Sequence, residues 1–232
     1  WIAEQPDSWR AGITHVTIDL SASYLRAVTD ALPHAVVVAD RFHLVRLAND
    51  MLTEVRQHAT REVRGRRGRK RDPEWVGRRK LLLAHERLDP AAFAKLWNAL
   101  IDAGDPGIEI LHAYTVKENL RHLLALSGTN PERSLIRDRL WRLYEQAATS
   151  TSPEVHRFAA TVEQWWPAIE AAIITNYSNA RSEGYNRLAK HQGRNVFGYR
   201  NVHNHRRAVS WACTRQYRRA SAAISEVPGQ VR

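Results

Sequence analysis

The sequence has almost no cysteine, no long apolar run and, toward its C-terminal end, almost no negative charge. Cys213 is the only cysteine, so a disulfide or a thiolate zinc site within the chain is excluded, and a reducing compartment is favoured. No apolar run reaches the roughly 18 residues that a membrane-spanning helix needs. We therefore expect no membrane partner.

The charge that is present is mostly positive. Net charge is +11 over 232 residues, a balance that favours polyanionic partners, with nucleic acid first among them. Between residues 171 and 225, Glu183 is the only acidic residue among many arginines. Since 44% of residues are apolar, the composition is that of a globular protein. The lone carboxylate in a basic segment therefore needs an explanation.

The N-terminal part predicts a β–α–β unit that follows the tail of a helix at residues 1–10. Apolar, β-branched runs predict strands at 13–20 and 34–40, and the segment 21–32 predicts a helix that Ser21 caps. Strands joined by a crossover helix run parallel. Asp19 and Asp40 should then lie at the same edge of the sheet, where open α/β sheets bind ligands.

Helical spacing dominates from residue 42 onward, so the expected fold class is α/β and predominantly helical. The first of these helices should bury Leu44, Leu47, Met51 and Val55 on one side. Further helices are predicted near 74–87, 90–103, 106–127, 132–149, 153–173, 178–190 and 202–222, with a loop at 192–201. Trp97, Trp141, Trp165 and Trp166 are expected in the core.

A run of positive charge interrupts this helical region. Seven of the eleven residues from Arg61 to Arg71 are lysine or arginine, and Gly65 and Gly68 lie among them. This composition predicts an exposed, mobile loop that holds phosphate groups. Its candidate DNA-binding residues are Arg66, Arg67, Arg69 and Lys70. A merely solvated segment, or one similar to a localisation signal, is the alternative.

The segment around Glu183 carries a polar helical face. At helical spacing, the face presents Asn179, Glu183, Asn186 and Lys190, and it is flanked by Arg187 and Arg194. A carboxylate there could hold a divalent ion, while the amides and cations hold phosphate oxygens or a nucleic-acid strand. The structural alternative is a solvated face on which Glu183 pairs with Arg187 at i,i+4.

The strand-end residues also have two interpretations. Asp19 and Asp40 could bind Mg²⁺ together, since such sites need carboxylates that converge from different elements. Alternatively, each aspartate forms a turn or caps the next helix. His43, three residues after Asp40, could contact a scissile phosphate or a metal-bound water, or could simply be a polar residue in a first helical turn.

Three segments together resemble a known family. "VTIDLSASYLRAV", "AVVVADRFHLVRLANDMLTEVR" and "SNARSEGYNRLAKHQGRNVFGYRNVHNHRRAV" are similar, in order and spacing, to insertion-sequence transposases of the ISL3 type. The likeness covers nearly the whole chain, and the "ADRFHL" and "SNARSEGYN…GYRN" blocks are specific when they occur together.

This resemblance implies a bacterial DDE transposase with an RNase H-like core, which cuts and joins DNA strands using Mg²⁺ or Mn²⁺. Asp19 and Glu183 match catalytic metal ligands, and Asp40 and His43 match the family's D-x-x-H motif. Residues 1–45 and 174–232 would form a partial RNase H-like core around a helical insertion at 46–173. The implied partners are double-stranded DNA, at the element ends and the target, and further copies of the full-length protein. The implied location is the bacterial cytoplasm, close to the nucleoid.

The chain departs from the family pattern at one point. The family's first catalytic aspartate lies on a strand upstream of anything present, so the resemblance identifies a C-terminal fragment. Such a fragment would bind metal weakly and would not cleave DNA alone. A non-catalytic DNA-binding or oligomerisation fragment, or a regulator that competes with the intact enzyme, is therefore the alternative function. A helical RNA-binding protein also fits the charge, but not the two-aspartate strand unit.

Overall fold

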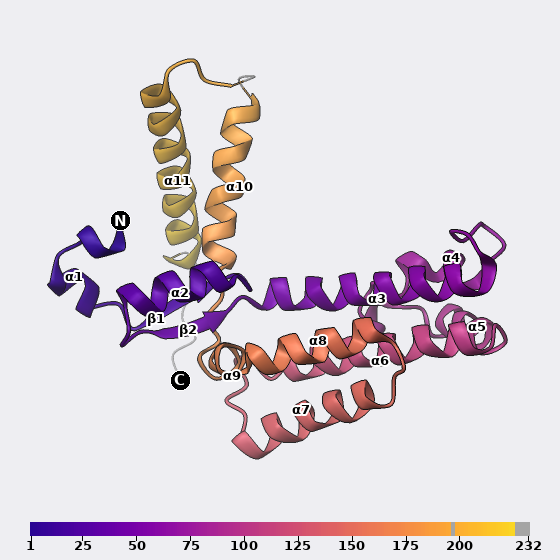
Figure 1. Ribbon diagram of the computed structural model, residues 1–232. Coiled ribbons are helices and arrows are strands. Elements are labelled where there is room, and N and C mark those ends of the chain that lie inside the picture. The colour runs from indigo at the N-terminus through magenta and orange to yellow at the C-terminus, as the bar shows by residue number, and fades with distance from the viewer. Residues whose placement is uncertain (196–197, 226–232) are drawn as a thin grey trace. The chain divides into compact units, whose positions relative to one another are not determined.

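The chain forms two compact units, the first spanning Trp1–Ser178 and the second starting at Asn179, and each is described by itself. The structure is a computed structural model that describes residues 1–195 and 198–225 (Figure 1). The first unit contains, in order, the 3₁₀ helix η1 (Ile2–Glu4), α1 (Asp7–Ala11), β1 (His15–Ile18), α2 (Ala22–Ala31), β2 (Val36–Ala39), α3 (Arg41–Arg64), α4 (Pro73–Val76), η2 (Gly77–Arg79), η3 (His85–Arg87), α5 (Pro90–Ile101), α6 (Asp105–Leu124), α7 (Arg133–Ala148), α8 (Pro153–Gln164) and α9 (Trp166–Thr175). The second contains α10 (Ala180–Asn195) and α11 (Val202–Ser225).

The predicted β–α–β unit is present. Strands β1 and β2 pair in parallel, with His15 opposite Val36 and Ile18 opposite Ala39. The Ser21 hydroxyl accepts a hydrogen bond from the backbone amide of Tyr24, so the predicted cap of α2 is confirmed. In the described residues these two strands make up the whole sheet. The α/β, mostly helical class is thereby confirmed.

Helix α3 is the longest element of the first unit and connects the sheet to the helical bundle. It begins after Asp40, whose side chain accepts from the Phe42 amide. It ends at Gly65, which adopts φ +61°, a left-handed conformation that glycine adopts without strain. Of the predicted apolar face, Leu44, Met51 and Val55 are buried and Leu47 is half-buried against the core.

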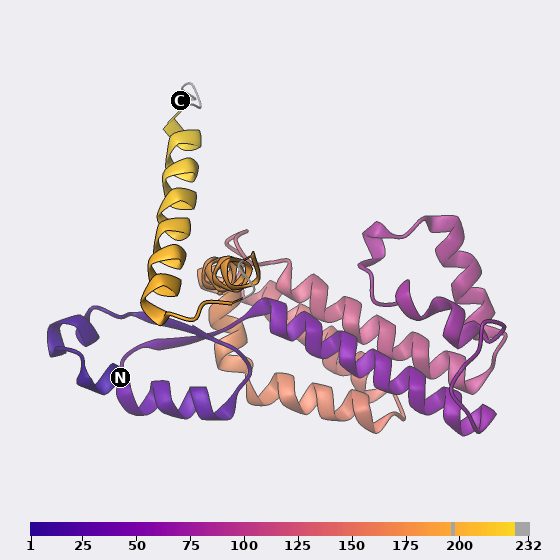
Figure 2. The same ribbon diagram turned by 90° about the horizontal axis from the view of Figure 1, so that it is seen from above.

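Helix α6 lies at the centre of the bundle. It packs against α3, α5 and α7, and α8 covers another side of α3 (Figures 1 and 2). Buried side chains therefore occur around much of its circumference, among them Ile110, Val116 and Leu120. Helix α9 packs on β2 and thus joins the bundle to the sheet. No helix in the described part of the chain is long and apolar enough to cross a membrane.

Two predicted helices are interrupted. The segment 74–87 forms only the short turns α4, η2 and η3. The segment 153–173 is divided between α8 and α9 at Trp165, directly before Trp166 and Pro167. Pro167 lacks the amide hydrogen that would bond to the carbonyl of Glu163, and its ring would clash with that carbonyl, so the helix is broken there.

Other boundaries also differ from the prediction. Helix α10 continues to Asn195, so the predicted loop at 192–201 begins later. Helix α11 continues to Ser225, three residues beyond its predicted end. Residues 196–197 of this loop lie outside the described residues. The placement of tryptophans in the core holds for Trp165, but it is wrong for Trp141, whose exposed fraction is 69%.

A buried lysine explains the break in the predicted helix at 74–87. The Lys117 ammonium has no exposed surface, and it donates to the backbone carbonyls of Leu81, at 2.7 Å, and Leu83, at 2.8 Å. It also lies 2.7 Å from a carboxylate oxygen of Glu118. Glu118 in turn accepts from the backbone amide of His85 at 3.3 Å. The connection between η2 and α5 is therefore held to α6 by hydrogen bonds from its backbone to Lys117 and Glu118, which also pair with each other.

We expect Lys117→Met to lower the free energy of unfolding by about 3 kcal/mol or more. The substitution leaves two buried carbonyls without their partner and removes one of the two cations that contact the buried Glu118 carboxylate, the other being Arg121 at 2.6 Å. Breaking one side of a buried pair has costs of this size. Urea unfolding followed by tryptophan fluorescence measures the change. Lys95→Met, the same substitution at an exposed position of α5, should change it by less than about 0.5 kcal/mol. Equal losses in both variants would contradict the role assigned to Lys117.

Candidate active site

Two aspartates lie at the shared edge of the parallel strands. Asp19 directly follows β1, and its carbonyl accepts from the Ser21 amide in a tight turn. Asp40 directly follows β2, and its amide donates to the carbonyl of Ile18, which extends the strand ladder by one bond. The Asp40 side chain is 4% exposed and that of Asp19 is 41% exposed. The Asp40 carboxylate therefore forms the buried side of the site, and the Asp19 carboxylate forms the side that is accessible to solvent.

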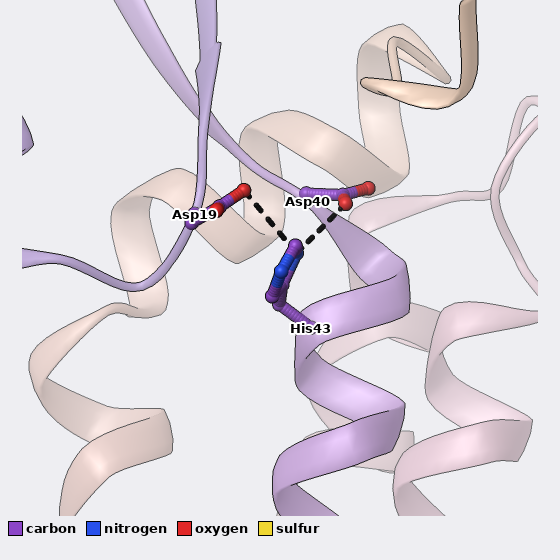
Figure 3. Close-up of side chains that lie close together, drawn as sticks. All are labelled: Asp19, Asp40 and His43. Carbon is purple, nitrogen blue, oxygen red and sulfur yellow. Dashed lines mark hydrogen bonds and ion pairs between the residues drawn. The ribbon is translucent and has the colours of Figure 1, made fainter. Parts of the chain in front are cut away.

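His43 joins the two aspartates. It lies in the first turn of α3, and its Nδ1 atom is 3.0 Å from Asp40 Oδ2 and 3.2 Å from Asp19 Oδ1 (Figure 3). The Nδ1 hydrogen can thus be shared between the carboxylates, which leaves Nε2 as the ring's second polar atom. Ligand atoms from all three residues lie within 4.8 Å of one another. Three residues that the sequence singled out separately are therefore brought together.

This donor set fits a divalent ion. Carboxylate oxygens are preferred ligands of Mg²⁺ and Mn²⁺, and imidazole is a common additional ligand of transition metals. A purely structural role explains part of the cluster, since Asp40 caps α3 and contacts His43 three residues later. It does not explain why Asp19, from the other strand, also reaches His43.

Glu183 lies in the second unit, on α10. Together with Asn186, Arg187, Lys190, His191 and Arg194 it lines an open groove of about 440 Å³ along one side of this helix. Asn179 lies at the start of α10, where its carbonyl accepts from the Glu183 amide at 2.9 Å. The helical spacing thus places Glu183 beside amide and basic side chains. His191 was missed by the sequence analysis, although its spacing from Arg187 and Arg194 predicts the same face.

The basic loop, residues 65–72, is organised around a buried carboxylate. Asp72 is 5% exposed and accepts from the Arg66 guanidinium, at 2.7 and 3.3 Å, and from the Arg69 backbone amide, at 2.6 Å. The hydrogen bond from Arg66 and the one from the amide lower the pKa of Asp72 to about 2. The resulting stabilisation is complete above the ordinary pKa of 3.8 and is lost as the pH falls toward 2.

The candidate DNA-binding residues of this loop therefore differ in their surroundings. The Arg66 side chain is turned inward to Asp72, whereas Arg67, Arg69 and Lys70 are exposed. Residue type alone could not separate Arg66 from Arg67, because the distinction depends on the buried carboxylate at position 72. The loop is irregular, as predicted, and its hydrogen bonds give it a defined conformation.

Comparison with known proteins gives consistent matches. The family model for DDE transposases of the ISL3 group, described as Transposase, matches residues 1–209. Similar curated proteins include the transposases for insertion sequence element IS1557 from Mycobacterium tuberculosis strains CDC 1551 / Oshkosh and ATCC 25618 / H37Rv. Each is 30% identical over 210 residues, which cover 82% of this chain and 45% of the relative. The chain thus spans about half the length of these relatives. No solved structure matches it.

The cluster at the strand ends predicts selective binding of Mn²⁺. Paramagnetic Mn²⁺ should broaden the NMR signals of the His43 ring at concentrations that leave the His58 ring unchanged. His58 is a matched control, because its Nδ1 atom contacts the Glu154 carboxylate at 3.0 Å, whereas that of His43 contacts the carboxylates of both Asp19 and Asp40. Asp19→Asn should remove the selective broadening. Equal broadening of both rings would exclude a site at this cluster.

The basic loop predicts a second difference, between two neighbouring arginines. Arg66→Ala removes the partner of Asp72, so the loop should open more often and trypsin should cleave within it severalfold faster. Arg67→Ala removes the same charge and one trypsin site from an exposed position, so cleavage at the remaining sites should not accelerate. Time-resolved digestion followed by mass spectrometry measures both rates. Equal acceleration would show that the contact between Arg66 and Asp72 does not hold the loop.

Proposed function

The chain belongs to the ISL3 family of DDE transposases, and on this premise we propose that it forms part of a catalytic region that cuts and joins DNA strands with divalent metal ions. The observation that carries the proposal is the convergence of Asp19, Asp40 and His43 at the ends of two parallel strands. Their ligand atoms lie close enough for one ion, and their positions are those at which α/β sheets bind ligands.

The proposed architecture is a partial RNase H-like core with a helical insertion. The core comprises residues 1–45, with the β–α–β unit, and residues 174–232, with the helix that carries Glu183. Residues 46–173 form the insertion. A single apolar core runs from Ile18, Val28 and Ala39 of the β–α–β unit to α6 and its neighbours, so the proposed insertion packs as one compact unit with the N-terminal part of the core.

The proposed roles of Asp19 and Glu183 follow from the resemblance to the family, and those of Asp40 and His43 also from their contacts. Asp19 and Glu183 hold the metal, which would be Mg²⁺ or Mn²⁺. When bound, such an ion activates water and neutralises charge on the phosphate. Asp40 is too enclosed to be the main ligand and instead orients His43 through Nδ1. The other ring nitrogen, Nε2, is then available to take a proton from water or, when protonated, to donate to a phosphate oxygen.

The basic surfaces have a proposed role in holding double-stranded DNA, at the ends of the element and at the target. In the second unit these residues are Asn179, Asn186, Arg187, Lys190 and Arg194, and in the first unit they belong to the basic loop. Glu183 is the only carboxylate in 171–225, so it is surrounded by groups that attract the substrate it acts on. Phosphate contacts of this kind position DNA without reading its sequence. We also propose that the full-length protein works as a homo-oligomer, close to the nucleoid.

We propose a second candidate function for this chain. The strand-end cluster contains two carboxylates, and the chain spans 45% of the length of its relatives. The small number of carboxylates in this cluster favours a non-catalytic role, in which the chain binds DNA or associates with intact transposase without cleaving, and binds metal weakly. Duplex binding that depends on salt, without metal-dependent nicking, would identify this function.

Glu183→Gln and Asp19→Asn should each lower metal-dependent strand cleavage by about a hundredfold or more. Metal coordination contributes several kcal/mol to the transition state, and each 1.4 kcal/mol corresponds to a factor of ten. The assay uses the protein as its gene encodes it, on DNA that carries the ends of its insertion sequence. DNA affinity should be retained, because neither carboxylate attracts phosphate.

Glu145→Gln is the matched control for this experiment. Glu145 is an exposed carboxylate on α7, and its substitution should leave cleavage unchanged. Full cleavage by the Glu183 variant would remove this residue from the metal site. Loss of cleavage together with loss of DNA affinity would instead assign it a role in binding or folding.

A further inference from the structure

The cations of the basic loop and of the last residue of α3 form an inner and an outer set. Arg64 and Arg66 face inward, where they pair with the buried carboxylates of Glu74, at 3.0 Å, and Asp72, at 2.7 Å. The outer set is Arg67, Arg69, Lys70 and Arg71, all with exposed side chains. No ion pair to a side chain of the outer set occurs in the described ranges 1–195 and 198–225. The inner pairs thus fix the loop, and the outer set carries uncompensated positive charge.

Two further contacts define the shape of the loop. Gly68 approaches Trp75 so closely that a Cβ atom at this position would lie 2.9 Å from the Trp75 Cβ. The Trp75 ring is itself covered by the guanidinium of Arg78, 4.1 Å from its centroid. A loop with a defined shape and unpaired outward cations loses less conformational entropy on binding a polyanion than a mobile one does.

Helix α3 sets the distance between this loop and the candidate active site. Asp40 and His43 lie at its N-terminal end, and the basic loop follows its C-terminal end (Figure 1). Its 24 residues, at about 1.5 Å each, span roughly 36 Å. All these residues belong to the first unit, so this spacing is part of its fold. One turn of B-form DNA has nearly the same length, about 34–36 Å or ten base pairs.

The exposed side of α3 between the two ends carries compensated charge. Asp50 lies 3.8 Å from Arg46, and Glu54 pairs with Arg157 of α8. A duplex that crosses this helix would therefore meet little net repulsion in the middle. It would meet attraction at the loop.

We propose that the basic loop contacts the phosphate backbone of a DNA duplex one helical turn away from the strand held at Asp19, Asp40 and His43. The inference rests on the proposed function, because it takes that cluster as the place of cleavage. Helix α3 then acts as a spacer that fixes where on the duplex the second contact falls.

The first test is the salt dependence of DNA binding. The affinity for DNA falls as the salt concentration rises, and a plot of log affinity against log salt has a negative slope. The double variant Arg67→Ala/Lys70→Ala should make this slope less steep, by about 0.9 for each lost phosphate contact. Arg133→Ala/Arg137→Ala removes two exposed charges from α7 and should leave the slope unchanged. A reduction of the same size in both variants would show that only net charge matters and would overturn the proposal.

The second test locates the contact along the duplex. Fe²⁺ bound in place of Mg²⁺ reduces added hydrogen peroxide to hydroxide and a hydroxyl radical, becoming Fe³⁺, and so marks the DNA next to the metal site. Hydroxyl-radical footprinting of the same complex then shows which backbone positions lose protection in Arg67→Ala/Lys70→Ala. Protection should be lost about ten base pairs from the iron-dependent cuts.

The outcomes of this experiment distinguish the proposed metal site at Asp19 from the proposed DNA contact of the basic loop. Iron-dependent cuts that persist in Asp19→Asn would overturn the proposed function and, with it, the place from which the distance is measured. Cuts that depend on Asp19, with protection by the loop that is unchanged or lost at a clearly different distance, would overturn this inference alone. Cuts that depend on Asp19 and protection lost one turn away would establish both.

Discussion

The parallel pairing of β1 with β2 is the constraint on which the rest of the site depends. Parallel register places the ends of both strands at one edge, and Asp19 and Asp40 directly follow those ends. An antiparallel pair would have put them at opposite ends of the sheet. Helix α3 starts at Asp40, so the same edge also fixes His43 and sets the direction of the longest helix in the first unit. The candidate active site thus follows from one short sheet, which also fixes the starting point of α3, the helix that sets the spacing to the basic loop.

The elements predicted most accurately were those that local signals determine. The Ser21 cap, the two strands and the apolar face of α3 depend on residues that are close in sequence. The interruption at 74–87 depends on Lys117, more than thirty residues away, whose ammonium binds carbonyls that a helix would otherwise use. The division at Trp165 could have been read from Pro167, because proline at the start of a helix is a local signal. Trp141 was placed in the core by residue type alone, which does not decide burial.

The candidate site shows the same division between local and distant information. Asp19, Asp40 and His43 were identified from strand ends and from a resemblance, and their convergence follows from the parallel pairing. The spacing of Glu183, Asn186 and Lys190 on α10 was predictable because helical periodicity is local. The organisation of the basic loop was not predictable in this way, because it depends on the burial of Asp72. Charge counting identified the segment, but packing decides which of its arginines remain available to a ligand.

Asp40 has two tasks that a substitution cannot separate. It caps the helix on which the bundle is assembled, and it orients the histidine of the candidate site. We therefore expect substitutions of Asp40 to affect both folding and chemistry, so loss of activity in an Asp40 variant has two explanations. Asp19 caps no helix of the described chain and is accessible to solvent. When transposase genes accumulate mutations, a change at Asp19 should thus give a protein that folds but is inactive. A change at Asp40 should instead reduce the amount of folded protein.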